Sequence, residues 1–177
     1  GFPDNKDRVV QNLSHMRIIK SLRMSCILMH NFGDEAARQP SRIVRGHIDL
    51  WWRGIPNLSL MLILAHLLVS DPLWQGIQLR ILRVSRPGEN ADEVNAELED
   101  IIDSARIDAE PKTIYSDDSF SDVMRRESAD ASAIFLGFSL PDSEEETFSM
   151  FEMMSKYLEG MPPTFLVFSS GEADLRV

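Results

Sequence analysis

The stretch from His47 to Val84 limits the possible folds more than any other part of the sequence. A short run, Ile48 to Trp52, is apolar apart from one acid and ends at a tight break that contains a glycine and a proline. A helix-length apolar run, Leu58 to Val69, follows, and a second strand-like run, Ile77 to Val84, completes the unit. This alternation predicts two parallel strands that are joined by a crossover helix.

The alternation of strand-like and helix-like runs continues to Phe168. The clearest helical pattern places Val94, Leu98 and Ile102 on one stripe and acidic residues on the opposite face. Further strands are expected near 112–115, 132–138 and 164–168, with helices near 120–127 and from Ser143 to Leu158. Residues 47–177 therefore predict a complete α/β subdomain with an open, doubly wound, mostly parallel five-stranded sheet.

Residues 1–32 predict a helix followed by one strand, Cys26 to His30. We interpret this pair as the last helix and strand of a preceding, incomplete α/β half-domain. Residues 33–46 contain glycine, proline and three arginines without a hydrophobic period, and they are interpreted as a linker. A structureless loop of that length is unusual inside one domain, so a domain boundary is expected there.

Charge is distributed unevenly along the 177 residues, whose net charge is −10. Up to Arg53 there are nine Lys and Arg against five Asp and Glu, and from Gly54 onward nine against twenty-three. An acidic body of this kind repels nucleic acid, which is therefore not an expected partner. The longest apolar run has twelve residues, whereas a membrane span needs about 20. The polar N-terminus predicts no signal peptide, and the single cysteine, Cys26, excludes an intrachain disulfide.

Ligands of such sheets bind beyond the carboxyl ends of the strands, so the residues that follow each strand are the candidates for a site. They are Arg53, Gly54 and Asn57 after the first strand, Ser85, Arg86, Pro87 and Gly88 after the second, and Ser139, Pro141 and Asp142 after the fourth. No glycine-rich phosphate motif is present, and the helix after the fourth strand begins with three glutamates, which repel phosphate. The sequence therefore disfavours nucleotide binding.

The sequence evidence for a metal site or a catalytic site is equally weak. Asp117, Asp118 and Asp122 could bind a divalent cation, but a solvated helix start with a capping Asp is the simpler interpretation. His66 lies on the most apolar helix and is interpreted as a buried core histidine. Asp49 is interpreted as a hydrogen-bonded structural acid or as one that faces a sheet edge. No catalytic, cofactor-binding or metal-binding residue is assigned, and we expect a binding or scaffolding protein rather than an enzyme.

Several of these segments together resemble the C-terminal cytosolic domain of the cation-chloride cotransporters. The double-tryptophan strand Ile48-Asp49-Leu50-Trp51-Trp52 is the most specific of them. The others are the leucine-rich helix 60–68, Trp74 with the strand Leu79-Arg80-Ile81-Leu82-Arg83-Val84, the segment 125–130, Leu136-Gly137 and the strand 163–167. The resemblance covers most of residues 47–170, and it marks Asp49, Trp51, Trp52 and Trp74 as structural motif residues.

The resemblance implies two related halves with a fold like that of the universal stress proteins, of which the second is complete here. It implies a non-catalytic, regulatory and dimerisation domain on the cytoplasmic face of the cell membrane. The partners would be the transmembrane part of the same transporter, which moves chloride with potassium or sodium, and a second copy. No cofactor is implied, and the lack of a long insert in the second half suggests a prokaryotic-type member. The alternative is a free-standing, stress-protein-like nucleotide-binding signalling protein.

Overall fold

A computed structural model describes residues 15–32, 46–86, 88–140 and 143–171. Its strands form one sheet in the order β1-β6-β5-β2-β3-β4, in which only the β1–β6 pair is antiparallel. The strands are β1 (Cys26–His30), β2 (His47–Trp51), β3 (Gln78–Ser85), β4 (Glu110–Tyr115), β5 (Ala133–Gly137) and β6 (Thr164–Phe168). The helices are α3 (Ile55–Val69), the 3₁₀ turn η1 (Pro72–Trp74), α4 (Ala91–Ala105), α5 (Phe120–Glu127) and α6 (Glu144–Leu158), and residues 15–21 are also helical.

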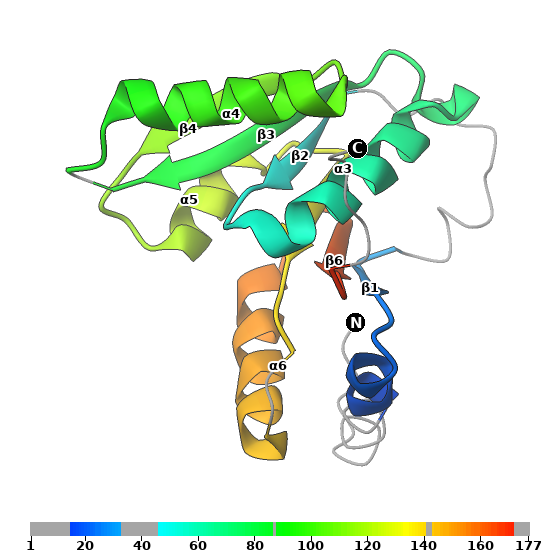
Figure 1. The fold of residues 1–177 in the computed structure, drawn as a ribbon. Helices are drawn as coiled ribbons and strands as arrows, with labels where there is room; N and C mark the ends of the chain where they lie inside the picture. Colours follow the sequence, from blue (N-terminus) through cyan, green and yellow to red (C-terminus); the bar gives the residue numbers. More distant parts are fainter. Residues whose placement is uncertain (1–14, 33–45, 87, 141–142, 172–177) are drawn as a thin grey trace.

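Helices cover both faces of the sheet (Figure 1). The side chains of Leu50, Met61 and Leu98 belong to a core between the sheet and the helices α3 and α4. Trp51, Met124 and Leu158 belong to a second core, which lies between the sheet, α5 and α6. Successive residues of β2 alternate between these two cores, as the pleat of a central strand requires. The open, mostly parallel, doubly wound α/β fold is thereby confirmed.

The number of strands differs from the prediction. The sheet has six strands, because β1 was expected outside the five-stranded sheet but pairs with β6, with Leu28 opposite Leu166. The helical residues 15–21 pack with it, since Met16 belongs to the same buried core as Leu158 of α6 and Lys20 Nζ donates to the Leu140 carbonyl at 2.8 Å. The assignment of residues 1–32 to a second half-domain stays a prediction. Most of the proposed linker, 33–45, lies outside the described residues.

The exposure of the outer face of α3 contradicts a second prediction. His66 was interpreted as a buried core histidine, but it is exposed, and the neighbouring Leu67 is 61% exposed. Leu58, Met61 and Ala65 face the sheet and are buried. The physical reason is that one helical layer covers each face of the sheet, so only one side of a helix in that layer meets the core. No described helix is both long and apolar enough to cross a membrane.

Candidate functional site

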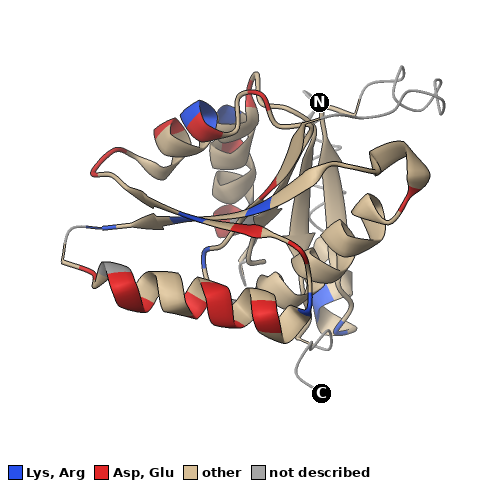
Figure 2. Cartoon of the chain, turned by 90° about the horizontal axis from the view of Figure 1, so that it is seen from above, with Lys and Arg blue, Asp and Glu red and all other residues tan. Residues whose placement is uncertain are grey.

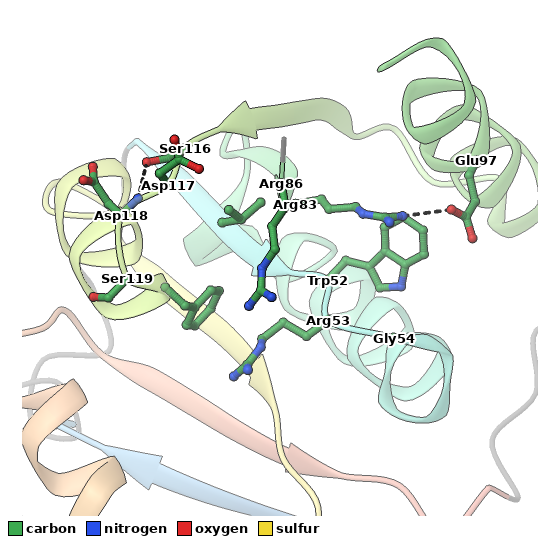
Figure 3. Close-up of a pocket in the computed structure, with 12 residues that line it drawn as sticks. Trp52, Arg53, Gly54, Arg83, Arg86, Glu97, Ser116, Asp117, Asp118 and Ser119 are labelled. Carbon is green, nitrogen blue, oxygen red and sulfur yellow. Dashed lines mark hydrogen bonds and ion pairs between the residues drawn. The ribbon is translucent and has the colours of Figure 1, made fainter. Parts of the chain in front are cut away.

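A cavity of about 660 Å³ lies at the carboxyl ends of β2, β3 and β4. Figure 3 shows it between the loops that follow these strands, with arginine side chains on one wall and the loop before α5 on the other. Its lining comprises Trp52, Arg53, Gly54, Arg83, Val84, Arg86, Glu97, Ser116, Asp117, Asp118, Ser119 and Phe120. The site therefore stands where ligands of parallel sheets bind, but toward the β4 edge.

Two arginines of the cavity are fixed on aromatic rings. The guanidinium of Arg53 lies 4.3 Å from the centre of the Phe120 ring, and that of Arg83 lies 4.5 Å from the Trp52 ring. Such cation–π contacts hold the cation over the ring face while the N–H edge of the guanidinium stays available. Arg83 uses that edge internally, because its Nη1 donates to the Glu97 carboxylate of α4 at 2.8 Å.

Arg53 and Arg86 differ from Arg83 in this respect. In the described part of the chain, neither guanidinium has an acidic side chain within ion-pair distance or a hydrogen-bond acceptor. Figure 3 shows both side chains extending into the same opening. Two guanidinium groups that form no close ion pair thus meet in a chain that carries a net charge of −10, although Glu89 attracts Arg86 at longer range. This arrangement suits an anion more than it suits a cation.

The opposite wall carries two carboxylates, those of Asp117 and Asp118, and the second of them is paired. Asp118 pairs with Arg126 at 3.0 Å, and its backbone N–H donates to Ser116 Oγ; together these hydrogen bonds hold the pKa of Asp118 below its ordinary value. Ser119 caps α5, and its hydroxyl donates to Asp122. The described residues contain no group of three or more metal-ligating side chains. The possible cation site at Asp117, Asp118 and Asp122 is thus not assembled there, and a capped helix start takes its place.

Outside the cavity, α4 presents acidic side chains along its outer face (Figure 2). The helix carries Asp92, Glu93, Glu97, Glu99, Asp100 and Asp103. Glu89, just before α4, accepts hydrogen bonds from the Ser85 hydroxyl and the Arg86 backbone amide, which lower its pKa. The lowered pKa keeps Glu89 ionised at neutral pH, where its charge also attracts Arg83 and Arg86.

One polar side chain links strand ends near the switch point between β2 and β5, where the strand order reverses. Asn57, in the first turn of α3, donates from Nδ2 to the Phe138 carbonyl at 2.9 Å and accepts the Ser169 amide at 2.8 Å. A Cβ atom at Gly137 would lie 2.9 Å from Asn57 Cβ. Asn57 therefore ties the start of α3 to the ends of β5 and β6, near the switch point at which nucleotides bind in many such sheets. The sequence analysis named Asn57 with Arg53, but the structure separates their roles.

The motif acid Asp49 belongs to a buried hydrogen-bond network between the sheet and the end of α5. Its carboxylate accepts two hydrogen bonds from Arg80, at 2.7 and 2.8 Å, and one from Ser128 Oγ at 2.6 Å. Parallel register makes Arg80 the direct neighbour of Asp49 on β3. Trp51 Nε1 donates to the same Ser128 hydroxyl at 3.0 Å. Asp49 is thus hydrogen-bonded, as one of the two interpretations expected.

The other two motif tryptophans lie apart from this network. Trp52 lines the cavity and is 5% exposed, whereas Trp74 lies in η1 beside an apolar groove of about 350 Å³. That groove is lined by Ile27, Leu64, Leu67, Leu68, Asp71, Leu73, Trp74, Phe135 and Phe165. The four motif residues therefore do not converge on one site, and the structural role assigned to the set stays a prediction.

Comparison with solved structures supports the fold. The chain is similar to the cytoplasmic domain of a prokaryotic cation chloride cotransporter, with a TM-score of 0.66 and 18% identity over 98% of this chain and 64% of that one. It is also similar to a universal stress protein from Archaeoglobus fulgidus DSM 4304, with a TM-score of 0.55 and 16% identity over 86% of this chain and 52% of that one. No family model and no curated protein matches. The resemblance expected from the sequence is thus confirmed as a likeness of fold, and the chain spans less than two thirds of either structure.

Proposed function

We propose that this chain forms part of the cytosolic regulatory and dimerisation domain of a membrane cation-chloride cotransporter. The observation that carries the proposal is the extent of the fold match, 98% of the chain for the transporter domain against 86% for the stress protein. The double-tryptophan strand, which suggested the same family, is the central strand β2. The domain itself is non-catalytic in this proposal, and a separate transmembrane part moves chloride with potassium or sodium.

The location of the native polypeptide tests this proposal. Membrane and soluble fractions of the source cells are blotted with an antibody against this domain. A band much larger than the 20.1 kDa of the chain, confined to membranes, is the expected result. A free soluble polypeptide near 20 kDa contradicts the proposal and favours the alternative, a stress-protein-like nucleotide binder. Asn57 supports the transporter role over that alternative, because its side chain is engaged at the ends of β5 and β6, near the usual nucleotide position.

The outer face of α3 is our candidate for the dimer surface, with a second copy of this chain as its occupant. Leu67 is 61% exposed there and borders the apolar groove beside Trp74. Residues 55–69 contain no Asp, Glu, Lys or Arg, so two copies can approach along this helix without the repulsion that a net charge of −10 creates elsewhere. Contiguous apolar surface of this kind is typical of interaction sites.

Sedimentation equilibrium of the 177-residue chain at rising concentration tests the dimer surface. Wild type is expected to dimerise, and Leu67→Lys is expected to shift the equilibrium to monomer. Leu22→Lys serves as the matched control, because Leu22 is also exposed (62%) but lies outside the groove. A strictly monomeric wild type at high micromolar concentration, or an equal effect of both variants, contradicts this assignment.

A further inference from the structure

We propose that the arginine-lined cavity binds a small phosphate-bearing anion between Arg53 and Arg86. The proposal concerns binding to the isolated chain and does not rest on the transporter role. It starts from the two guanidinium groups that enter the cavity and that form no ion pair or hydrogen bond in the described structure, Arg86 being attracted by Glu89 only at longer range. The other arginines of the sheet and of α5 are engaged: Arg80 with Asp49, Arg83 with Glu97, Arg125 with the end of α6, and Arg126 with Asp118.

Phosphate fits this pair of arginines for geometric reasons. A guanidinium presents N–H groups in a planar fork, and two forks can share the terminal oxygens of one phosphate. The Phe120 ring, 4.3 Å from the Arg53 guanidinium carbon, restricts how that side chain can turn, so less conformational entropy is lost when it binds. The cavity volume of about 660 Å³ leaves room for a phosphorylated small molecule beyond the phosphate itself.

The backbone around Arg53 adds to the positive character of the cavity. Gly54 has a φ of 129°, which turns the chain from β2 directly into α3, and its lack of a side chain leaves the helix without a side-chain cap. The first turn of α3 carries no acidic residue. A helix start of this kind presents the positive end of its dipole, and here it supplements the two arginine side chains.

The opposite wall contributes one further donor. Ser116 Oγ accepts the Asp118 amide at 3.1 Å, which leaves its hydroxyl hydrogen free to reach a ligand oxygen. Asp117 lines the same wall and repels anions, so the phosphate is expected nearer to the arginine wall. Asp118 is compensated by Arg126.

The two aromatic rings of the cavity each have one face covered by an arginine, which limits stacking with a ligand's base. Arg53 covers a face of Phe120, and Arg83 covers a face of Trp52. A nucleobase would have to displace one of these arginines in order to stack on the covered ring face. We therefore infer that the phosphate groups are recognised and that a base adds little, which separates this site from a nucleotide-specific one.

Isothermal titration of inorganic pyrophosphate into the 177-residue chain at low ionic strength tests the proposal. Saturable binding at one site is expected, and Arg53→Gln and Arg86→Gln are each expected to weaken it by about tenfold. Lys156→Gln removes the same charge from the exposed face of α6 and is expected to leave the affinity within about twofold. Both arginines are exposed, so unchanged melting curves will show that the variants fold.

Absence of saturable binding overturns the proposal, and so does an equal loss of affinity in all three variants, since that indicates a general charge effect. Titration with ADP and with adenosine distinguishes the sources of the phosphate. Equal affinities for ADP and pyrophosphate, with no binding of adenosine, are expected. Binding of adenosine, or tighter binding of ADP by more than about tenfold, indicates recognition of the base and also overturns the proposal.

Discussion

Replacement of Asp49 by Asn is the sharpest test of how this sheet is held together. The carboxylate is fully buried, while Arg80 on the neighbouring strand is 15% exposed and donates two of the three hydrogen bonds that the carboxylate accepts. Removal of one partner from a buried ion pair costs about 3–5 kcal/mol, because the remaining charge stays in the interior without compensation. Arg80 keeps a hydrogen bond to the Glu127 carbonyl at 3.1 Å, so we expect the lower end, about 3 kcal/mol.

Urea unfolding and thermal unfolding of wild type and Asp49→Asn measure this cost. For a chain of this length, about 3 kcal/mol corresponds to a decrease in Tm of roughly 6–12 °C. Asp118→Asn is the matched control, because it removes the same charge from a pair whose side chains are 58% and 53% exposed. Exposed pairs contribute little to stability, so the control is expected to melt close to wild type.

A double-mutant cycle separates the ion pair from other effects of the substitution. Asp49→Asn and Arg80→Gln are each expected to be strongly destabilising, whereas the double variant is expected to cost clearly less than their sum. The reason is that two neutral side chains leave no unpaired charge in the interior. If Asp49→Asn destabilises no more than Asp118→Asn, or if the two single effects simply add, the reasoning about this buried pair is refuted.

Three further changes test other parts of the structure. Gly137→Ala should cost about 1–3 kcal/mol in chemical unfolding, because its Cβ would lie 2.9 Å from Asn57 Cβ. Arg125→Gln should lower the unfolding free energy by about 1–2 kcal/mol through loss of the bonds to the Glu159, Lys156 and Tyr157 carbonyls at the end of α6; an unchanged value contradicts this. Burial lowers the pKa of His30 below 6.5, so the unfolded chain binds more protons and stability should fall as the pH drops below that value. His30→Gln should flatten this part of the pH profile of Tm.

The order of helices and strands could be predicted because each element carries its own pattern. The stripe of Val94, Leu98 and Ile102 placed α4, and the apolar runs placed β5 and β6. The partner of β1 was not predictable, because the apolar pattern of Cys26 to His30 does not encode which strand it meets. The exposure of Leu67 was missed for a related reason, since an apolar helix face does not state whether anything covers it.

The candidate site was only partly visible in the sequence. Topology placed Arg53 and Arg86 after adjacent parallel strands, and the structure brings them to one cavity. The loop from Ser116 to Ser119 was considered for a metal rather than as the opposite wall. The ion pair of Arg83 with Glu97 and the cation–π contact of Arg53 with Phe120 depend on side-chain packing against α4 and α5, which no local sequence pattern contains.

A chain of side-chain contacts connects the buried network around Asp49 with the cavity beyond the end of β2. The Asp49 carboxylate accepts a hydrogen bond from the Ser128 hydroxyl, which in turn accepts one from the Trp51 indole N–H. The Trp51 ring packs edge-on against Phe120, with 5.3 Å between the ring centres. Phe120 in turn carries the Arg53 guanidinium. Loss of the Asp49 charge should therefore lower stability first and loosen Arg53 only through the Trp51–Phe120 contact. Since β5 and β3 fix both sides of β2, we expect pyrophosphate affinity to change far less in Asp49→Asn than in Arg53→Gln.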